Sequence, residues 1–302
     1  MPSELVCLGN LVVDDVVFPD GGTRVGQAGG AVLYVALGAA AWGARVAVVA
    51  PVGEDYPAEA LAALAGRGVD LSGLRPLCRP GLRAWLVYAP EGRRIVPREG
   101  RPGHAEGSPG PADLACAAAR GARIYHLAPQ PRASQAALVA ALARERGALL
   151  SLDPCEQVTP ATLGAWGETL AGVDVFLANE EELRLPGAGE EPLRALRAAA
   201  GGRLRQVLWK LGARGGLLHD GALGVSTPWA ARAAAVVDVT GAGDAFAGGF
   251  LAGLLAGEPP AAALERGVVS ASFALEGWGP AGLLAATPAA ARARRAAWFG
   301  AA

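Results

Sequence analysis

Lysine, asparagine and histidine are almost missing from this chain of 302 residues. A single lysine, Lys210, stands among 27 basic residues, so the other 26 are arginines, and asparagine occurs only at Asn10 and Asn179. The 28 acidic residues bring the formal net charge to -1. This balance argues against a nucleic-acid-binding protein, which normally carries an excess of basic residues. Against so skewed a composition, each remaining lysine or asparagine is a candidate for a specific role.

Metal-binding and disulfide patterns are also missing. The four cysteines lie far apart without a C-x-x-C pair, and the three histidines are scattered among them, which argues against a zinc site or a disulfide framework. The N-terminus carries an acidic residue where a signal peptide would carry basic ones. The most apolar stretch, 28–44, is too short and too rich in glycine for a membrane span. We expect a soluble, cytoplasmic protein that binds neither membranes nor nucleic acids.

Short apolar runs alternate with longer helical patterns along most of the chain. This order is typical of an α/β fold with a largely parallel sheet. Helices on both faces of the sheet would allow its strands to be apolar on both sides. The predicted core strands are 5–8, 45–50, 123–127, 148–152, 173–177 and 206–211.

Two stretches, at about 11–30 and 80–100, lack a helical pattern. Each has a strand, turn, strand pattern, with the turns at PDGG and PEGR. If the two stretches pair, they form a small separate sheet that covers the main domain as a lid. The alternative is that both are edge strands of the main sheet.

The most informative segment is 238–250, DVTGAGDAFAGGF. It follows an apolar run, 233–237, and precedes a helical pattern without proline, which places 241–243 at a strand-to-helix turn. Free amides and the helix dipole at such a turn bind anions. A carboxylate at Asp244 would repel a bound phosphate, and removing a proton from an attacking hydroxyl is a reason for it to be there. The alternative is that Asp244 only complements the helix dipole.

Two further segments follow predicted strands. Lys210 precedes the glycine turn of Gly212 and Gly215, where a lysine suits a nucleotide phosphate, although the chain has no Walker A sequence. Asn179 begins N-E-E-E, so it can cap a following helix, and Glu182 on the same face can order a magnesium ion or its waters. Ordinary turn glycines and a plain helix cap are the structural alternatives.

Together and in this order, these segments resemble the PfkB or ribokinase family of carbohydrate kinases. The signature D-[TP]-[TV]-G-A-G-D is matched at 238–244 with valine in the second position, and N-x-x-E at 179–182. The turn T-x-G-x-x-G is matched at 210–215 with lysine in place of threonine. In the N-terminal half, G-x-x-x-x-D is matched at 9–14 and the di-glycine at 29–30, so the resemblance spans residues 5 to about 285.

The resemblance implies a ribokinase-like three-layer α/β/α sandwich with a small β-sheet lid, as a single domain over 1–302. It also implies transfer of the γ-phosphoryl group of ATP, with Mg2+, to a hydroxyl of a sugar or sugar-like substrate. A K+ ion near the signature and a homodimer through the lid are known among relatives. The implied roles are base for Asp244, anion hole for Gly241, Ala242 and Gly243, ATP binding for Lys210, Gly212 and Gly215, substrate binding for Asp14, Gly29, Gly30 and Tyr34, magnesium binding through water for Asn179 and Glu182, and K+ binding for Asp238 and Thr240.

One position departs from the family pattern, because Tyr34 stands where an asparagine normally binds a sugar hydroxyl. The departure leaves a nucleoside kinase of the adenosine or inosine type, or a cyclitol kinase, as alternatives. Aromatic rings in the pocket would favour the nucleoside, with Tyr34, Trp85 and Tyr88 as candidates. A non-catalytic sensor of nucleotides or sugars is the alternative from another class. For the adenine ring we expect a pocket near 219–227 and 268–277.

Overall fold

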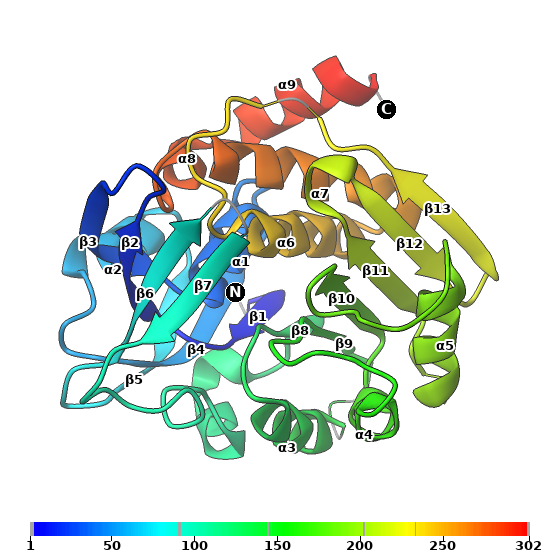
Figure 1. Cartoon of the computed structure of the whole chain (residues 1–302), viewed down its shortest axis with the longest axis horizontal. Helices are drawn as coiled ribbons and strands as arrows, with labels where there is room; N and C mark the ends of the chain where they lie inside the picture. The colour runs from blue at the N-terminus through cyan, green and yellow to red at the C-terminus, as the bar shows by residue number, and fades with distance from the viewer. Residues whose placement is uncertain are drawn as a thin grey trace.

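A nine-stranded sheet forms the centre of the protein (Figure 1). The computed structural model describes residues 3–89, 92–143, 145, 147–201, 203–232 and 234–300. The seven strands from β11 to β5 are parallel, and β12 and β13 extend one edge in antiparallel fashion. The six predicted core strands are all present, within two residues at each end. The order across the sheet is β13 (Val225–Trp229), β12 (Gly216–Asp220), β11 (Gln206–Lys210), β10 (Val175–Asn179), β9 (Leu149–Leu152), β8 (Ile124–Leu127), β1 (Leu5–Leu8), β4 (Val46–Val52) and β5 (Asp70–Pro76).

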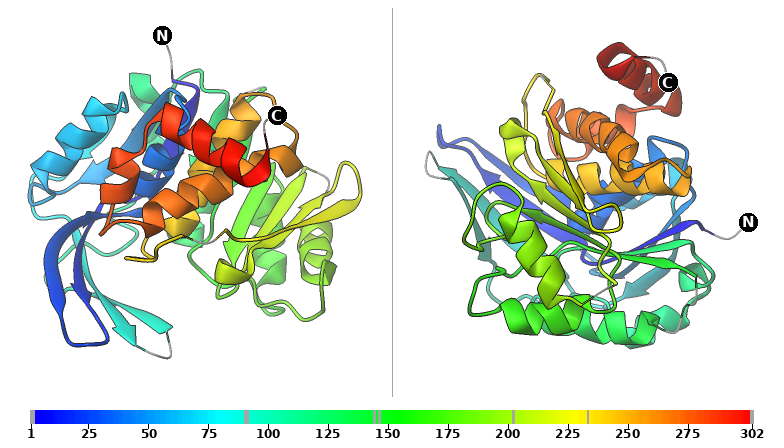
Figure 2. Two further views of the ribbon diagram at one scale, coloured as in Figure 1. Left: turned by 90° about the horizontal axis from the view of Figure 1, so that it is seen from above. Right: turned by 90° about the vertical axis from the view of Figure 1, so that its right-hand side faces the viewer.

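Helices cover both faces of this sheet, which confirms the three-layer α/β/α architecture (Figures 1 and 2). Alternate strand residues point to opposite faces, and both sets are apolar and buried, as expected for a parallel sheet. One face packs against α3 (Arg132–Leu142), α4 (Leu163–Leu170) and α5 (Glu191–Ala199). The other carries α1 (Ala31–Ala40), α2 (Ala58–Gly66), α6 (Ala242–Leu255) and α7 (Pro260–Leu275), with α8 (Ala281–Ala285) and α9 (Pro288–Phe299) against them. No helix in the described part of the chain is both long and apolar enough to span a bilayer.

Helices α1 and α6 approach one another closely because glycines stand at their crossing. A Cβ atom on Gly248 would lie 2.1 Å from the carbonyl oxygen of Val35, and one on Gly38 would lie 2.4 Å from that of Ala245. Both distances are far below van der Waals contact. The glycines of α6 therefore determine how the helix that carries Asp244 sits against α1.

We expect Gly248→Ala to destabilise the protein by roughly 1–3 kcal/mol, the usual range for overpacking a close-packed interior. Gly164→Ala, in the exposed first turn of α4, is the matched control because an added Cβ meets no atom within 4 Å there. It should leave stability unchanged or slightly raised, since alanine has the higher helix propensity. Urea unfolding of both variants measures the difference. Equal stabilities would show that the α1–α6 crossing adjusts freely.

The two stretches without helices pair with one another and form a second, four-stranded sheet (Figures 1 and 2). This finding confirms a separate lid sheet and rules out the alternative that these strands are edges of the main sheet. Strand β6 lies parallel to β2, and both hairpins are antiparallel. The order is β3 (Thr23–Gly29), β2 (Val12–Val17), β6 (Leu82–Ala89) and β7 (Gly92–Pro97).

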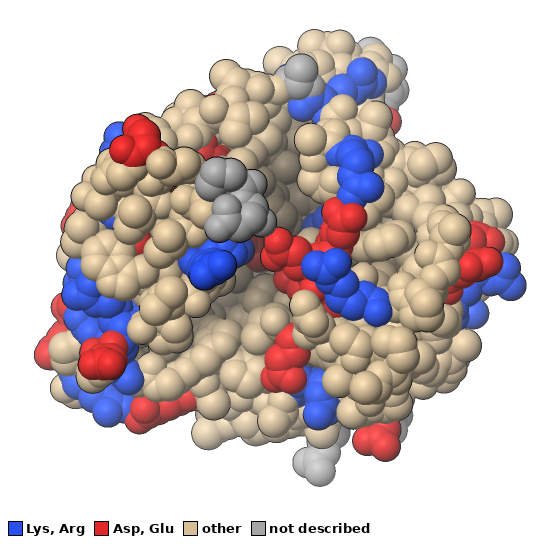
Figure 3. Space-filling view, viewed as in Figure 1, with Lys and Arg blue, Asp and Glu red and all other residues tan. Residues whose placement is uncertain are grey.

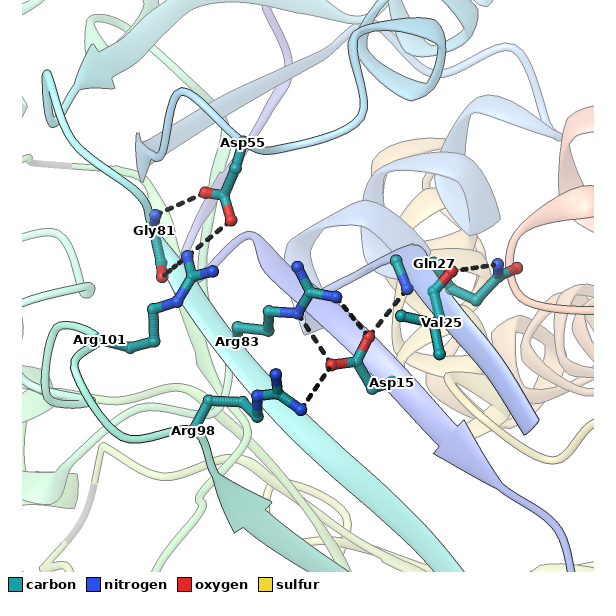
Figure 4. Close-up of polar contacts among 9 residues, drawn as sticks. Asp15, Val25, Gln27, Asp55, Gly81, Arg83, Arg98 and Arg101 are labelled. Carbon is teal, nitrogen blue, oxygen red and sulfur yellow. Dashed lines mark hydrogen bonds and ion pairs between the residues drawn. The ribbon is translucent and has the colours of Figure 1, made fainter. Parts of the chain in front are cut away.

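Two carboxylates, one buried and one partly exposed, hold the lid strands together and join them to the main sheet (Figure 4). Asp15 is fully buried, accepts two hydrogen bonds of 2.8 Å from Arg83 and one of 2.9 Å from the Gly26 amide, and also pairs with Arg98. Asp55, in the loop after β4, accepts bonds from the Gly81 amide at 2.7 Å and from Arg101 at 2.6 Å. Asp15 therefore links three lid strands, and Asp55 ties the start of β6 to the main sheet.

Two local predictions are wrong. Residues 234–237 do not form a strand: Val236 is 64% exposed, and the segment crosses the surface to reach α6, held by a bond from the Val237 amide to the Leu275 carbonyl. Residue 233, the first of the predicted apolar run, lies outside the described residues. The acidic run after Asn179 forms one turn rather than a helix, because Leu183 pairs with Val158 in an isolated bridge. Apolar composition and helix-capping residues both predicted more regular structure than the chain forms here.

Candidate active site

Three polar side chains meet where neighbouring parallel strands end. Asp153 follows β9, Asn179 ends β10 and Lys210 ends β11, so all three lie at the carboxyl edge of the sheet. The Lys210 Nζ atom donates to Asp153 Oδ2 at 2.5 Å, and both side chains are largely buried, with exposures of 11% and 1%. Asp153 was not predicted as a site residue. Its position directly after an apolar strand is a signal that could have identified it.

The glycine turn before α6 lies directly above this ion pair. Gly241 precedes the helix in a left-handed conformation with φ of 74°, and no side chain caps the helix. A Cβ atom on Gly243 would lie only 3.6 Å from Lys210 Nζ. The structure thus brings together the predicted anion turn and the predicted phosphate-binding lysine, which are more than 30 residues apart in sequence. A lysine and free amides of a helix N-terminus suit a phosphate group.

Asp244 stands in the first turn of α6, beside the Lys210–Asp153 pair. Burial raises its pKa to about 7; Asp153 adds to the increase, and Lys210 and Arg93 oppose it. A carboxyl group with a pKa near the working pH is suited to accept a proton from a substrate hydroxyl. The alternative is that Asp244 serves only the helix dipole. This alternative accounts for its place in the first turn of α6 but does not require the nearby charges of Asp153, Lys210 and Arg93.

The ligand-free protein should lose stability as the pH rises from 7 to 9. Burial raises the pKa of Asp14 and Asp244 to about 7 and that of Glu182 to about 8, so above the ordinary histidine pKa of ~6.5, where the histidines with lowered pKa no longer offset them, the folded protein binds more protons than the unfolded chain. The stabilisation is complete below the unfolded value of ~4 and disappears as each folded pKa is passed. Urea unfolding at both pH values should show a smaller loss in Asp244→Asn than in the unaltered protein. Identical losses would contradict the raised pKa of Asp244.

Asn179 and Glu182 bind one another's backbone. The Asn179 side-chain oxygen accepts the amides of Glu181 at 2.7 Å and Glu182 at 3.0 Å, and Glu182 Oε2 accepts the Asn179 amide at 2.8 Å. This reciprocal capping arrangement leaves one Glu182 oxygen free of it. This capping turn is the arrangement that the structural alternative predicts for these residues. It also holds Glu182 near Asp153 and Lys210, because the Glu182 pKa is raised by burial and, secondly, by the charge of Asp153, and is lowered by that of Lys210.

These residues fit a magnesium ion bound mainly through phosphates and water. Among the described residues no group of three or more His, Cys, Asp or Glu side chains could hold a metal ion alone. Asp153 Oδ1, however, is buried and has no hydrogen-bond partner, and the raised pKa of Glu182 indicates a carboxylate that a cation would stabilise. Mg2+ usually keeps several waters and takes one or two protein carboxylates.

The glycine turn after Lys210 takes the tight form that its sequence predicts. Residues Gly212–Arg214 form a short 3-10 turn (η3), and Gly212 and Gly215 have φ of 58° and 83°. A Cβ on Gly215 would lie 1.9 Å from the Trp229 carbonyl oxygen, so only glycine allows β13 to pack here. No atom lies within 4 Å of the corresponding position on Gly212, which leaves open space beside the backbone.

The predicted substrate residues of the N-terminal half lie together across from α6. Asp14, on the lid strand β2, is 7% exposed and lies so close to Gly29 that a Cβ there would be 1.8 Å from its carboxylate. Gly30 has φ of 100°, and a Cβ atom on it would lie 2.2 Å from the Asn10 carbonyl oxygen. The di-glycine is therefore required by the close approach of the backbone to the carboxylate and to the chain before β2.

Tyr34 joins the two halves of the site. Its ring packs against Gly241, where a Cβ would lie 2.2 Å from the ring, and it lines a small cavity with Asp14, Asp238 and Thr240. Burial raises its pKa well above the usual value, and the charges of Asp14, Asp238 and Asp244 add to the effect, so its hydroxyl stays protonated. It can donate a hydrogen bond to a substrate, as an asparagine at this position would, from a larger side chain.

Aromatic side chains that were not predicted close the mouth of this cavity. Phe18, in the turn between β2 and β3, makes an edge-on contact with Trp278, with ring centroids 4.8 Å apart. The Arg24 guanidinium lies over the Trp278 ring, 4.4 Å from its centroid. The enclosed volume is only about 10 Å³, room for about one water molecule. No local sequence signal marks Phe18 or Trp278.

The lid also contacts the loop that precedes the anion turn. The Tyr88 hydroxyl, on β6, hydrogen-bonds to the Thr240 hydroxyl, and the Asp238 carboxylate accepts the amides of Thr240 at 2.9 Å and Gly279 at 3.0 Å. Figure 3 shows acidic and basic side chains gathered around the hollow between the lid and the rest of the molecule. Trp85, by contrast, lies on the outer face of the lid, 4.8 Å from Arg98, and does not line the cavity.

The expected adenine position near 219–227 is not beside the phosphate turn. Strand β12 runs antiparallel to β11, so His219 pairs with Val207 near the opposite edge of the sheet, where its ring contacts Ser226. An aromatic residue that does lie near the phosphate turn is Trp229. It pairs with Gly216 across β12 and β13, and its ring stacks on that of Phe246 with the ring centroids 5.3 Å apart. The antiparallel direction of β12 could not be predicted from its apolar composition.

Comparison with known proteins agrees with this geometry. A cytidine kinase of Thermococcus kodakarensis is 30% identical over 277 residues, which cover 91% of this chain and 97% of that protein. An acarbose 7(IV)-phosphotransferase of Actinoplanes sp. is 33% identical over 257 residues, 83% of this chain and 80% of that protein. A nucleoside kinase of Burkholderia thailandensis, solved with inosine, has the same fold, with a TM-score of 0.73, 18% identity and coverage of 98% of both chains. A ribokinase of Cryptococcus neoformans, solved with ADP, also has this fold. Its TM-score is 0.75 and its identity 20%, and the match covers 97% of this chain and 99% of that chain.

The fold, the anion turn and these similarities define a phosphotransferase that acts on small molecules. The model of the pfkB family of carbohydrate kinases matches residues 3–285. The chain belongs to this family.

Proposed function

We propose that the protein transfers the γ-phosphoryl group of ATP to a hydroxyl group of a sugar or of the sugar part of a nucleoside. One observation supports this proposal above all others: Asp244, the anion turn and the Lys210–Asp153 pair lie together in one partly buried site, and Tyr34 connects this site to Asp14. A proton acceptor, a phosphate-binding turn and a polyol-binding carboxylate are the three parts that such a transfer needs.

In the proposed reaction, Asp14 accepts hydrogen bonds from substrate hydroxyls and fixes the reacting hydroxyl near Asp244. Asp244 takes the proton as the hydroxyl oxygen attacks the γ-phosphorus, and the bond from that phosphorus to the bridging β-phosphate oxygen breaks. The backbone amides of 241–243 stabilise the charge on the transferred group. Lys210 and the turn of Gly212 and Gly215 hold the nucleotide phosphates.

A magnesium ion would neutralise charge on the phosphates. Glu182 and Asp153 would hold it through water, consistent with the unpartnered Asp153 oxygen. K+ beside Asp238 and Thr240 stays a prediction, as do the single-domain organisation over 1–302 and a homodimer through the lid. Closure of the lid would exclude water and so protect ATP from hydrolysis.

Within this reaction, the aromatic mouth of the cavity favours a nucleoside over a free sugar. Phe18, Trp278 and the Arg24 guanidinium supply flat surfaces at the position where the lid meets the body, with the Trp278 ring centroid 4.8 Å from that of Phe18 and 4.4 Å from the Arg24 guanidinium. Such surfaces stack on a heterocyclic base, whereas a free sugar needs hydrogen-bonding groups there instead. The similarity to a cytidine kinase supports the same choice.

A panel assay tests the proposal. ADP release is measured with Mg-ATP and, in turn, free sugars, cyclitols and nucleosides. We expect turnover with a nucleoside, and its loss in Trp278→Ala through a raised KM. Turnover with sugars or cyclitols alone would retain the kinase and reject the nucleoside. Binding of ATP without turnover on any compound would identify a non-catalytic sensor and reject the proposed function.

A further inference from the structure

The last helix, α9 (Pro288–Phe299), follows the residues that the family model matches, which end at 285. It crosses the outer side of α7 (Figures 1 and 2). Within this helix, all of which the structure describes, Ala291 alone is buried, so little apolar surface holds it in place. Arg295 instead donates hydrogen bonds of 2.7 Å to Glu258, just before α7, and to Glu265 within it. The position of α9 therefore depends largely on its arginines.

A second arginine of α9, Arg294, holds the C-terminal end of α7. Its guanidinium donates to both carboxylate oxygens of Glu276 at 2.9 Å and to the Ser272 hydroxyl at 2.8 Å. It also lies over the Phe273 ring, 3.9 Å from the ring centroid. Two parallel donors to one carboxylate fix orientation as well as distance. Arg294 therefore fixes the last turn of α7 and the start of the chain that leaves it.

The turn that follows α7, residues 276–280, forms one wall of the substrate cavity, because Trp278 and Gly279 line it. The Gly279 amide donates to the Asp238 carboxylate at 3.0 Å. The carbonyl of Leu275, the last residue of α7, accepts the Val237 amide at 2.7 Å. These bonds join the turn to the connection that leads into the anion turn. Neither segment is a helix or a strand, so their relative position depends on such bonds.

Helix α9 also contacts the chain just before this connection. Arg232 donates to the Trp298 carbonyl at 3.0 Å, and its guanidinium lies 4.9 Å from the Phe299 ring centroid. The helix therefore holds both segments that meet at Asp238, one through Arg232 and the other through Arg294.

Building on the proposed function, we propose that Arg294 is a positioning residue for the substrate cavity. Through Glu276 it fixes the turn that carries Trp278, and so the distance between this ring and the lid residues that face it. Arg294 contacts neither the substrate nor ATP in this proposal. Its contribution is to substrate binding, through the position of Trp278, rather than to proton or phosphoryl transfer.

Arg294→Ala and Arg292→Ala form a matched pair that tests this inference, since Arg292 lies on the same helix but is exposed. Kinetics use the acceptor with the highest turnover in the panel assay. We expect Arg294→Ala to raise the KM of this acceptor by about 2- to 30-fold, the range for residues that act through a packed network. The kcat and the KM of Mg-ATP should change less. In a Trp278→Ala background, Arg294→Ala should have no further effect, and Arg292→Ala should behave as the unaltered enzyme.

Hydrogen exchange of the ligand-free protein tests the positioning step without turnover. Arg294→Ala should speed the exchange of the Val237 and Gly279 amides, because their bonds would open more often. Arg292→Ala should leave both rates unchanged. If Arg294→Ala does not fold, Glu276→Gln replaces it in both experiments, because it removes the charge of the pair and keeps the size of the side chain.

Several results would overturn the inference. They are unchanged exchange of both amides, equal acceptor KM in the two alanine variants, a rise in KM that Mg-ATP shares equally, and a rise that persists in full in the Trp278→Ala background. Faster exchange in Arg294→Ala together with absence of turnover in the unaltered protein would instead reject the proposed function and retain the contact of Arg294 with the turn. The two failures are therefore distinguishable.

Discussion

Asp244→Asn should lower turnover by at least ~10²-fold, the lower end of the effect of a positioned general base, and leave the affinity for Mg-ATP nearly unchanged. Asparagine keeps the size of the side chain but cannot accept the proton of the substrate hydroxyl. Burial, and secondly Asp153, raise the Asp244 pKa to about 7, so kcat/KM of the unaltered enzyme should rise with pH up to this value as Asp244 ionises. Steady-state kinetics and calorimetric titration with Mg-ATP measure the two effects separately.

Glu180→Gln is the control for this experiment. Glu180 is exposed in the turn next to Asn179 and forms a surface ion pair with Arg214, so it shares the neighbourhood without facing the cavity. Its substitution should leave turnover unchanged, since an exposed ion pair contributes little. An Asp244→Asn enzyme as active as the control would reject Asp244 as the base.

Lys210→Ala should have the second largest effect, on both stability and nucleotide affinity. Removing the lysine leaves the Asp153 carboxylate, 1% exposed, without its partner. Breaking a buried ion pair in this way costs about 3–5 kcal/mol. The loss of a cation 3.6 Å from the Cβ position of Gly243 should also weaken Mg-ATP binding, because the proposed function places the nucleotide phosphates beside this lysine. Urea unfolding and calorimetry measure the two losses.

The double variant Lys210→Met with Asp153→Leu separates stability from binding. Replacing both members of a buried ion pair with apolar side chains of similar size is often neutral for stability. We therefore expect the double variant to recover most of the stability that Lys210→Ala loses and to bind Mg-ATP as weakly. Full recovery of affinity in the double variant, or unchanged affinity in Lys210→Ala, would assign Lys210 a structural role only.

Much of the fold could be predicted because its signals are local. The core strands were predicted within two residues, since a buried parallel strand is a short apolar run bounded by turns and needs no knowledge of its neighbours. The lid hairpins were predicted for the same reason. The strand expected at 233–237 is absent over the described residues 234–237, because apolar composition alone does not distinguish a strand from an exposed connection, and Val236 is exposed.

The site residues divide in the same way. Asp244, Lys210, Asn179 and Glu182 stand in short motifs with glycines or caps, whose function depends on backbone geometry within a few residues. Asp153, Phe18 and Trp278 belong to no motif. They acquire a role only from the pairing of strands and from the approach of the lid to the body.

The sequence by itself determined the alternation of strands and helices, the glycine turns and the membership of a kinase family, because each depends on residues near one another in the chain. Its single lysine and one of its two asparagines marked two positions, Lys210 and Asn179, which the structure places side by side at the carboxyl edge of the sheet. Only the tertiary structure decided that Lys210 is paired with Asp153 and lies beneath Gly243. It also decided that Tyr34 bridges the two halves of the site. These contacts join residues that are more than 30 positions, or in the case of Tyr34 and Gly241 about 200 positions, apart in the sequence, so no local pattern encodes them.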